Sequence, residues 1–418
     1  MAIPLTKIQK SASPVRTSER FAILDILRGL ALLGIALANF PEFSLYTFLS
    51  AEATQAFPTA RIDSVVRFLQ YVFIDGKFYT LFSLLFGIGF SIIISNAIKK
   101  GANGFRIFYR RMGILTLIGF LHLMFIWSGD ILMLYALLGL FLPRFRNASD
   151  RALLTWAGAL LFLPILIDLF IEIRHIYPAT PVVHWQHYYC AKYGITEENF
   201  AYWLRDADNY QGMFEFLIQG ALVRVQEFID GNRYFKVMGL FLIGFYIGRK
   251  RMYADLESLK PFLKQLFRAG MLIGLPYSVL YAWSAMNQHP FGLAAHSVLY
   301  CISVYPLGFA YMAGVCLFFL RKPDWKPFHL FAFSGRMALS NYIGQSLWGI
   351  AIFYGIGLEL GASMGLIYVL LIATGVYIIE SLFSSVWLRH FQFGLLEWIW
   401  RMLTYGKRFP LYTSGNKF

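Results

Sequence analysis

The chain has 418 residues and is strongly apolar. Charged residues make up only 14% of it, against about 25% in ordinary soluble domains. Hydrophobic residues make up 58%, aromatic residues 18%, and the mean hydropathy is +0.56. This composition excludes a water-soluble protein, and the long apolar runs lack the period-two alternation of a barrel strand. We therefore predict an all-α, polytopic helical membrane protein whose main partner is the lipid bilayer.

The formal net charge of +14 would suggest nucleic-acid binding in a soluble protein. In a membrane protein a simpler cause exists, because Lys and Arg concentrate on the cytoplasmic side. No basic segment is long enough to form a separate domain. We therefore expect no nucleic-acid partner.

About ten apolar segments fit a pattern of transmembrane helices with both termini cytoplasmic, although the fourth of them is short. They cover residues 21–42, 77–98, 110–128, 131–143, 152–173, 232–248, 262–283, 294–320, 337–357 and 362–386. In this arrangement most of the 37 Lys and Arg side chains lie on the cytoplasmic side, as the positive-inside rule requires. The segment 62–74 is apolar but contains Asp63 and Arg67, so we expect an interfacial helix on the outer side.

The spans and their connections predict five regions. They are a cytoplasmic tail (1–20), an N-terminal membrane region (21–174), an extracytoplasmic insertion (175–230), a C-terminal membrane region (231–405) and a cytoplasmic tail (406–418). The insertion contains His175, His184, His187 and Cys190, whose spacing is irregular for metal ligands. The three cysteines of the chain make neither a disulfide framework nor a zinc site, so no metal is expected.

Two segments of the chain resemble each other, 73–90 and 228–245. Phe73-Ile-Asp-Gly76 recurs as Phe228-Ile-Asp-Gly231, Leu85-Phe86 as Leu240-Phe241, and Ile88-Gly-Phe90 as Ile243-Gly-Phe245. Both copies run from outside to inside, so a repeat would be parallel. Either the two helices correspond structurally, or the match reflects the residue types that all apolar helices share.

Ionisable residues inside a membrane are costly, so each is a candidate functional residue. Asp25 and Arg28 share one face near the inner end of the first span; they either neutralise each other or leave Arg28 to hold an anionic group. His122 lies about 16 Å along its helix from Arg111, in the outer half of the bilayer. It is either an interhelical hydrogen-bonding group or a general base, which Asp130 could orient only through a fold-back of the chain or a water molecule.

Further polar candidates lie at the outer rim and in the ninth span. Asp75 and Lys77 open the second span, where they belong either to a functional rim or to a solvated edge. Asn341 and Gln345 are four residues apart and share one helix face. Amides in such positions either pair with a neighbouring helix or polarise a substrate.

Several stretches resemble the YeiB family of bacterial inner-membrane proteins, whose C-terminal half is known as domain of unknown function 418. They are Leu24-Asp-Ile-Leu-Arg-Gly-Leu-Ala-Leu-Leu-Gly-Ile35 with Asn39, Lys77-Phe78 through Leu84-Leu-Phe-Gly87, Leu121-His122 to Gly129-Asp-Ile-Leu132, Gly335-Arg-Met-Ala-Leu-Ser-Asn-Tyr342 with Gln345-Ser346, and Gly394-Leu-Leu-Glu-Trp-Ile-Trp-Arg401. The resemblance implies a multi-pass protein of the bacterial inner (cytoplasmic) membrane.

The family is distantly similar to transmembrane acyltransferases, such as the lysosomal glucosaminide N-acetyltransferases. The shared signature is Leu-Asp-x-x-Arg-Gly in the first span, followed by a polar residue, here Asn39. The resemblance implies acyl-CoA as a co-substrate, with no bound cofactor, and an envelope or small-molecule acceptor such as a glycan. Val65 stands where the glucosaminide enzymes have their catalytic histidine.

Two functions fit these residues. In a membrane acyltransferase, His122 and Asp130 would be catalytic, and the substrates would bind to Asp25, Arg28, Asn39, Asp75, Lys77, Asn341 and Gln345. In a transporter or small-molecule binding protein, Asp75, Lys77, His122 and Asp130 would line a polar path. The sequence does not predict an oligomeric state.

Overall fold

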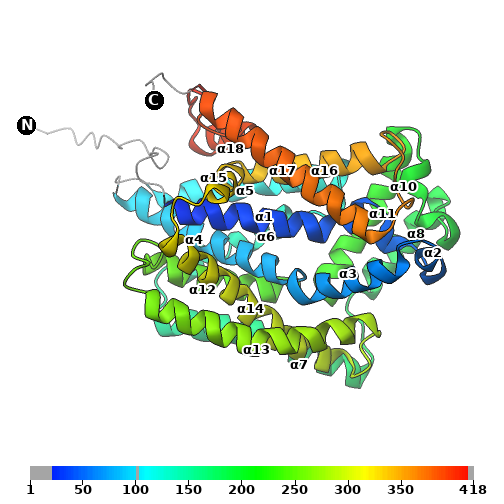
Figure 1. The fold of residues 1–418 in the computed structure, drawn as a ribbon, viewed down its shortest axis with the longest axis horizontal. Helices are drawn as coiled ribbons and strands as arrows, with labels where there is room; N and C mark the ends of the chain where they lie inside the picture. The colour runs from blue at the N-terminus through cyan, green and yellow to red at the C-terminus, as the bar shows by residue number, and fades with distance from the viewer. Residues whose placement is uncertain (1–20, 100–102, 413–418) are drawn as a thin grey trace, which may run out of the picture.

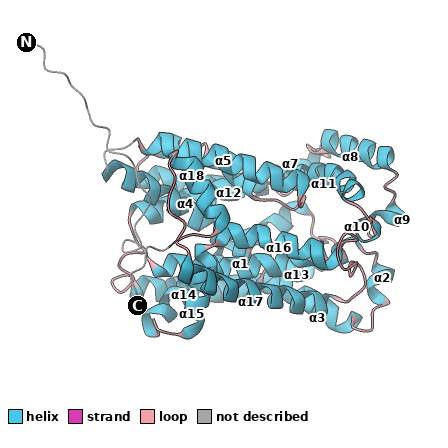
Figure 2. Ribbon diagram, turned by 90° about the horizontal axis from the view of Figure 1, so that it is seen from above, coloured by secondary structure: helices cyan, strands magenta, loops and turns pink. Residues whose placement is uncertain are grey.

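A computed structural model describes residues 21–99 and 103–412, so the predicted tail 1–20 and residues 413–418 lie outside the described part. The described residues form a helical bundle with no strand, apart from one isolated bridge between Phe391 and Tyr412. The main helices run along the long axis of the molecule (Figure 1), and a view turned by 90° shows the same direction (Figure 2).

The elements follow one another in this order: α1 (Ala22–Phe43), η2 (Tyr46–Phe48), α2 (Ala51–Gln55), α3 (Ala60–Phe73), α4 (Lys77–Lys99), α5 (Gly104–Phe125), α6 (Leu132–Gly139), η3 (Leu142–Phe145), α7 (Asp150–Arg174), α8 (Thr180–Tyr193), α9 (Glu197–Phe200), α10 (Trp203–Asp206), α11 (Tyr210–Asp230), α12 (Arg233–Arg249), α13 (Lys260–Met286), α14 (Leu293–Arg321), α15 (Lys326–Arg336), α16 (Ala338–Phe353), α17 (Leu366–His390) and α18 (Leu395–Tyr405).

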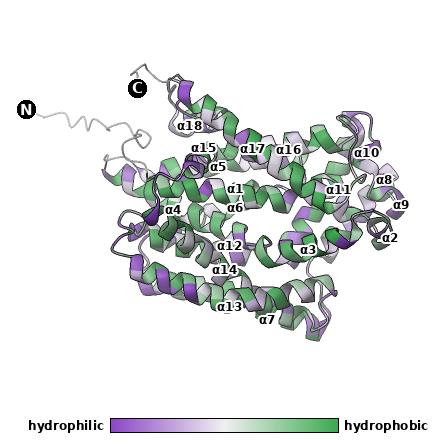
Figure 3. Cartoon of the chain, in the orientation of Figure 1, coloured by the Kyte–Doolittle hydropathy of each residue, from purple (hydrophilic) through white to green (hydrophobic). Residues whose placement is uncertain are grey.

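Seven helical segments of the described chain are long and apolar enough to cross a bilayer: α1, α3 together with α4, α5, α7, α13, α14 and α17. The prediction of a polytopic helical membrane protein is therefore confirmed. The predicted spans at 131–143, 232–248 and 337–357 correspond to the shorter helices α6, α12 and α16. Hydrophobic residues dominate the middle of the bundle, and hydrophilic residues gather at its two ends (Figure 3).

The fourth predicted span, 131–143, needs a correction. Helix α6 and the following η3 together cover Leu132–Phe145, about 20 Å of helix, whereas the hydrocarbon core is about 30 Å thick. This segment does not cross the bilayer as a full span. Asp130, which the sequence had placed at an outer turn, is buried in the bundle with an exposed fraction of 2%.

The predicted interfacial helix at 62–74 is also corrected. It corresponds to α3, which runs along the bundle axis beside α13 and α17 instead of across it (Figures 1 and 2). The apolar side chains Ile62, Val65, Leu69 and Phe73 form an exposed stripe, while the polar side chains of Asp63 and Gln70 are buried in the bundle. Asp63 accepts a hydrogen bond from Ile367 N, and Gln70 donates one to Leu37 O. The exposed apolar stripe of α3 suits lipid, and two of its polar side chains, Asp63 and Gln70, join it to the rest of the bundle.

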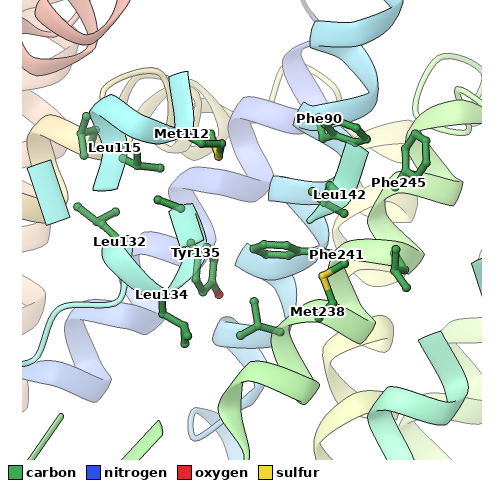
Figure 4. Packing of buried hydrophobic residues seen from close by; sticks show 14 of the residues in the cluster. Phe90, Met112, Leu115, Leu132, Leu134, Tyr135, Leu142, Met238, Phe241 and Phe245 are labelled. Carbon is green, nitrogen blue, oxygen red and sulfur yellow. The ribbon is translucent and has the colours of Figure 1, made fainter. Parts of the chain in front are cut away.

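The two similar segments of the sequence pack against each other as α4 and α12. Phe86 stacks on its counterpart Phe241 with ring centroids 4.4 Å apart, and Phe90 meets its counterpart Phe245 at 4.9 Å. Figure 4 shows Phe90 facing Phe245, with Phe241 in the same cluster. Each helix follows a break at which one residue has a left-handed backbone, Gly76 before α4 and Asn232 before α12. The two similar segments are therefore neighbouring helices that pack against each other through equivalent phenylalanines.

The ends of the bundle separate two groups of connections. Helices α2, α8, α9 and α10 lie at one end, whereas the start of α1, α15 and α18 lie at the other (Figures 1 and 3). The second end carries the basic connections that the charge rule assigns to the cytoplasm, such as Arg249–Arg251 and Arg321–Lys322. We call it the inner end and the opposite one the outer end.

Candidate functional site: two cavities and a buried Asp–His–Ser chain

Two large cavities lie inside the bundle. The outer cavity, of about 940 Å³, is lined by residues near the outer end, and the inner cavity, of about 860 Å³, by residues near the inner end. They share one wall, made of Ile35, Phe82, Ile131, Tyr135 and Tyr342. Helices α1, α4, α6 and α16 therefore meet where the two cavities are closest.

The inner cavity is strongly basic. Its lining contains Arg28, Lys99, Arg111, Arg251, Arg336 and Arg401, and only two acidic side chains, Asp25 and Glu397. The predicted Asp25–Arg28 pair is present, with Arg28 Nη1 2.7 Å from Asp25 Oδ1. Arginine is suited to bind phosphate and carboxylate groups, so this cavity can accept a polyanionic ligand.

The wall of the inner cavity is held by α18. The Arg111 guanidinium lies 3.5 Å from the centroid of the Trp400 ring. Glu397 accepts hydrogen bonds from Leu339 N (2.7 Å), Ser340 N (3.0 Å) and the Ser340 hydroxyl (2.6 Å). A carboxylate at this position caps the first turn of α16. Burial of the Glu397 carboxyl raises its pKa above the usual value.

The outer cavity contains both charges and many tyrosines. Asn39 and Asp75, two of the residues predicted to bind a substrate, line it. Asp75 Oδ2 accepts a hydrogen bond of 2.5 Å from the Tyr281 hydroxyl. On the opposite side Arg224 lies between two carboxylates, Glu42 (3.2 Å) and Glu227 (2.5 Å). Much of the charge lining this cavity is therefore already paired.

A chain of three buried side chains lies beside the shared wall. His122 Nδ1 is 2.8 Å from Asp130 Oδ2, and His122 Nε2 is 2.9 Å from the Ser346 hydroxyl. The exposed fraction is 1% for His122 and Ser346 and 2% for Asp130. With Asp130 accepting the Nδ1 proton, Nε2 is the acceptor that faces Ser346, which is the geometry of a nucleophile, a base and an orienting acid.

The backbone after α5 brings Asp130 to His122. The amides of Ile126 and Trp127 both donate to His122 O, which ends the helix and turns the chain back. Asp130 Oδ1 then accepts a hydrogen bond from Met133 N at the start of α6 (2.8 Å). Of the two routes that the sequence left open for orienting His122, the fold-back is the one that forms.

The remaining predicted site residues lie elsewhere. Lys77 is fully buried, and its ammonium donates to Tyr71 O at 2.7 Å. Asn341 is hydrogen-bonded to Ser334 and Ser384, and Gln345 donates to Glu380 of α17 (3.3 Å). None of these three residues lines either cavity. The two amides join α16 to its neighbours, which is the interhelical pairing that the sequence left open.

Sequence reasoning missed Ser346 and Tyr342. A single serine in an apolar helix has no distinctive pattern, although Ser346 directly follows the nominated Gln345. Tyr342 lies one helical turn before Ser346, lines both cavities, and its ring centroid is 5.3 Å from that of His122. The spacing of four residues on α16 was the only available signal, since it places both side chains on one face.

Comparison with known proteins gives relatives but no activity. The chain is similar to the uncharacterized protein YxaH of Bacillus subtilis (strain 168), with 31% identity over 408 residues, covering 94% of this chain and 96% of the relative. It is similar to the uncharacterized protein YeiB of Escherichia coli (strain K12), with 30% identity over 412 residues, covering 92% and 96%. An uncharacterized 39.9 kDa protein in the amylase 3' region of Bacillus acidopullulyticus is 28% identical over 403 residues, covering 95% and 97%.

No solved structure matches the chain. The family model described as protein of unknown function (DUF418) matches residues 247–407, from the end of α12 to just beyond α18. Together with the full-length similarity to YeiB and YxaH, this match assigns the chain to a family. The protein is a multi-pass membrane protein that belongs to the YeiB family, whose C-terminal region is DUF418.

Proposed function

We propose that the protein is an acyltransferase of the bacterial inner membrane. It would move an acyl group from a CoA thioester in the inner cavity to an envelope or small-molecule acceptor in the outer cavity. One observation carries the proposal: two cavities from opposite ends of the bundle share a wall beside the Asp130–His122–Ser346 chain.

The inner cavity suits the donor because its lining is basic. Acyl-CoA carries several phosphate charges, and the arginines of this cavity, including Arg28 and Arg111, offer the forked donors that bind phosphate. The thioester would then point away from the cytoplasmic end, toward the shared wall. Acyl-CoA is a co-substrate here and not a bound cofactor.

The chemistry would occur in two steps. His122 removes the proton of the Ser346 hydroxyl, Ser346 Oγ bonds to the thioester carbon, the C–S bond breaks, and the proton leaves with the thiol. In the second step the acceptor hydroxyl or amine gives its proton to His122, attacks the acyl–serine ester, and Ser346 recovers its proton. A movement of Tyr342, one turn away on the same helix face, would open Ser346 to the substrates.

The test is incubation of the purified full-length protein with radiolabelled acetyl-CoA, followed by mass spectrometry. Wild type should hydrolyse acetyl-CoA slowly and carry an acetyl group on Ser346. His122→Ala and Ser346→Ala should each lower the rate at least about 100-fold. The matched control is Ser303→Ala, which removes another fully buried hydroxyl from a membrane helix away from both cavities. Turnover that is equal in wild type and both variants would contradict the proposal.

A second candidate function is transport, because two cavities separated by a thin wall also fit a closed pathway across the membrane. In that case acetyl-CoA would neither label nor be hydrolysed by the protein. Proteoliposomes would instead take up a small polar solute, and substitutions of wall residues such as Tyr342 would change the rate of uptake.

A further inference from the structure

Lys236 is a buried ammonium that faces the outer cavity. It lies in the first turn of α12, lines the cavity, and has an exposed fraction of only 9%. Its Nζ is 4.1 Å from the centroid of the Tyr300 ring. In the described part of the chain, the Lys236 ammonium has no carboxylate within 4.0 Å and makes no hydrogen bond.

The acidic groups around Lys236 already have donors. Asp168, across from it on α7, accepts hydrogen bonds from Asn232 Nδ2 (2.8 Å) and from the Ser297 hydroxyl. Asp75 accepts from the Tyr281 hydroxyl. The N–H groups of the Lys236 ammonium are thus free to bind a ligand in this part of the cavity.

Other groups on this side of the cavity can also donate a hydrogen bond. His296 stacks on Tyr281 with ring centroids 4.8 Å apart, and the ring centroids of His289 and His296 are 3.9 Å apart. The rings of Tyr281 and Tyr300 are 5.8 Å apart, so they connect Lys236 to the two histidines. An anion between these side chains would have a point charge on one side and aromatic or imidazole edges on the other.

A buried charge is costly unless it is paired, and an ammonium that faces a cavity large enough for a small molecule can acquire its partner from a ligand. We infer that Lys236 binds the anionic group, a carboxylate or a phosphate, of a small molecule in the outer cavity. The inference does not depend on acyl transfer. If acyl transfer is the activity, it defines the acceptor as an anionic molecule.

The experiment measures phosphate binding by calorimetry. The full-length protein is placed in nanodiscs of phosphatidylcholine alone and titrated with inorganic phosphate. Wild type should bind, and Lys236→Gln should weaken binding at least about tenfold, whereas Lys236→Arg should retain most of the affinity. Lys322→Gln is the control, because it removes an exposed lysine at the inner end.

A parallel arm identifies the source of the anion. Nanodiscs that contain phosphatidylglycerol should protect Lys236 from amine acetylation if the ligand is a lipid headgroup, and soluble phosphate should protect it if the ligand is a free anion. Protection is read by mass spectrometry on the wild-type protein, so it does not require that a variant folds. Absence of both binding and protection, or unchanged binding by Lys236→Gln, would overturn the inference. If wild type binds phosphate but does not turn over acetyl-CoA, the result would contradict the proposed acyl transfer and leave the anion site standing.

Discussion

Asp130 shows how much one side chain decides in this protein. One of its oxygens caps the start of α6, and the other contacts the ring of His122. The same carboxylate therefore accepts a hydrogen bond from a free backbone amide at the start of a short helix and also fixes the orientation of a histidine ring. Loss of the charge would affect both, which is why His122→Ala and Ser346→Ala are cleaner tests of the proposed chemistry.

Glu397 gives a residue-scale prediction about stability. Glu397→Gln keeps the shape of the side chain but removes the negative charge at the start of α16, where it accepts three hydrogen bonds. We expect a loss of about 1–2 kcal/mol in the free energy of unfolding, measured as a lower thermal midpoint in detergent. Glu257→Gln, which affects only an exposed pair with Lys260, should leave the midpoint within error. An unchanged midpoint in Glu397→Gln would show that the cap contributes nothing.

At the scale of elements, two helix pairs share one design. Helix α3 leads through a break into α4, and α11 leads through a break into α12. In both pairs the carboxylate before the break, Asp75 or Asp230, lines the outer cavity. The second helices of the two pairs, α4 and α12, pack closely enough for equivalent phenylalanines to touch. Helices α4 and α12 thus both contribute to the lining of the outer cavity and support each other by direct packing.

The close approach of α4 and α12 predicts a sharp difference between two glycines. A Cβ atom at Gly244 would lie 2.1 Å from Leu84 O, a backbone atom that cannot move alone, whereas a Cβ at Gly89 would meet nothing within 4 Å. Gly244→Ala should therefore cost about 1–3 kcal/mol of stability. Gly89→Ala should be neutral or slightly stabilising, because alanine favours a helix. Thermal unfolding of the two variants beside wild type checks this, and equal midpoints would contradict the packing.

At the scale of the whole molecule, the two cavities have opposite chemical character. The inner cavity is basic, whereas the outer one carries both signs of charge and a wall of tyrosines. Each cavity can thus select a different molecule, and the shared wall is where the two could meet. The arrangement of helices across the membrane decides which compartment each cavity faces.

The topology can be checked with single cysteines. In a variant that lacks Cys190, Gln288→Cys at the outer end should react with an impermeant maleimide in intact spheroplasts. Lys322→Cys at the inner end should react only after the membrane is permeabilised, because the basic loops face the cytoplasm. Labelling of Lys322→Cys in intact spheroplasts would reverse the orientation of both cavities.

The sequence by itself determined the fold class and the ends of most spans. Apolar runs of sufficient length and the distribution of Lys and Arg are local properties, and membrane physics leaves helices as the only way to satisfy such a backbone. The similarity of 73–90 to 228–245 was also visible, but only the tertiary structure shows that the two segments pack against each other, with Phe86 on Phe241. Periodicity found the amphipathic face of α3 without showing which side faces lipid.

Tertiary structure decided the candidate site. His122 and Asp130 could be nominated because an ionisable group in a span is rare, yet their contact depends on the turn after α5. Ser346 is 224 residues from His122 in the chain, so no local pattern could join them. The two cavities likewise arise from side chains of many helices. Sequence sets which residues must be buried in a membrane, and only the packing of distant helices decides which of them touch.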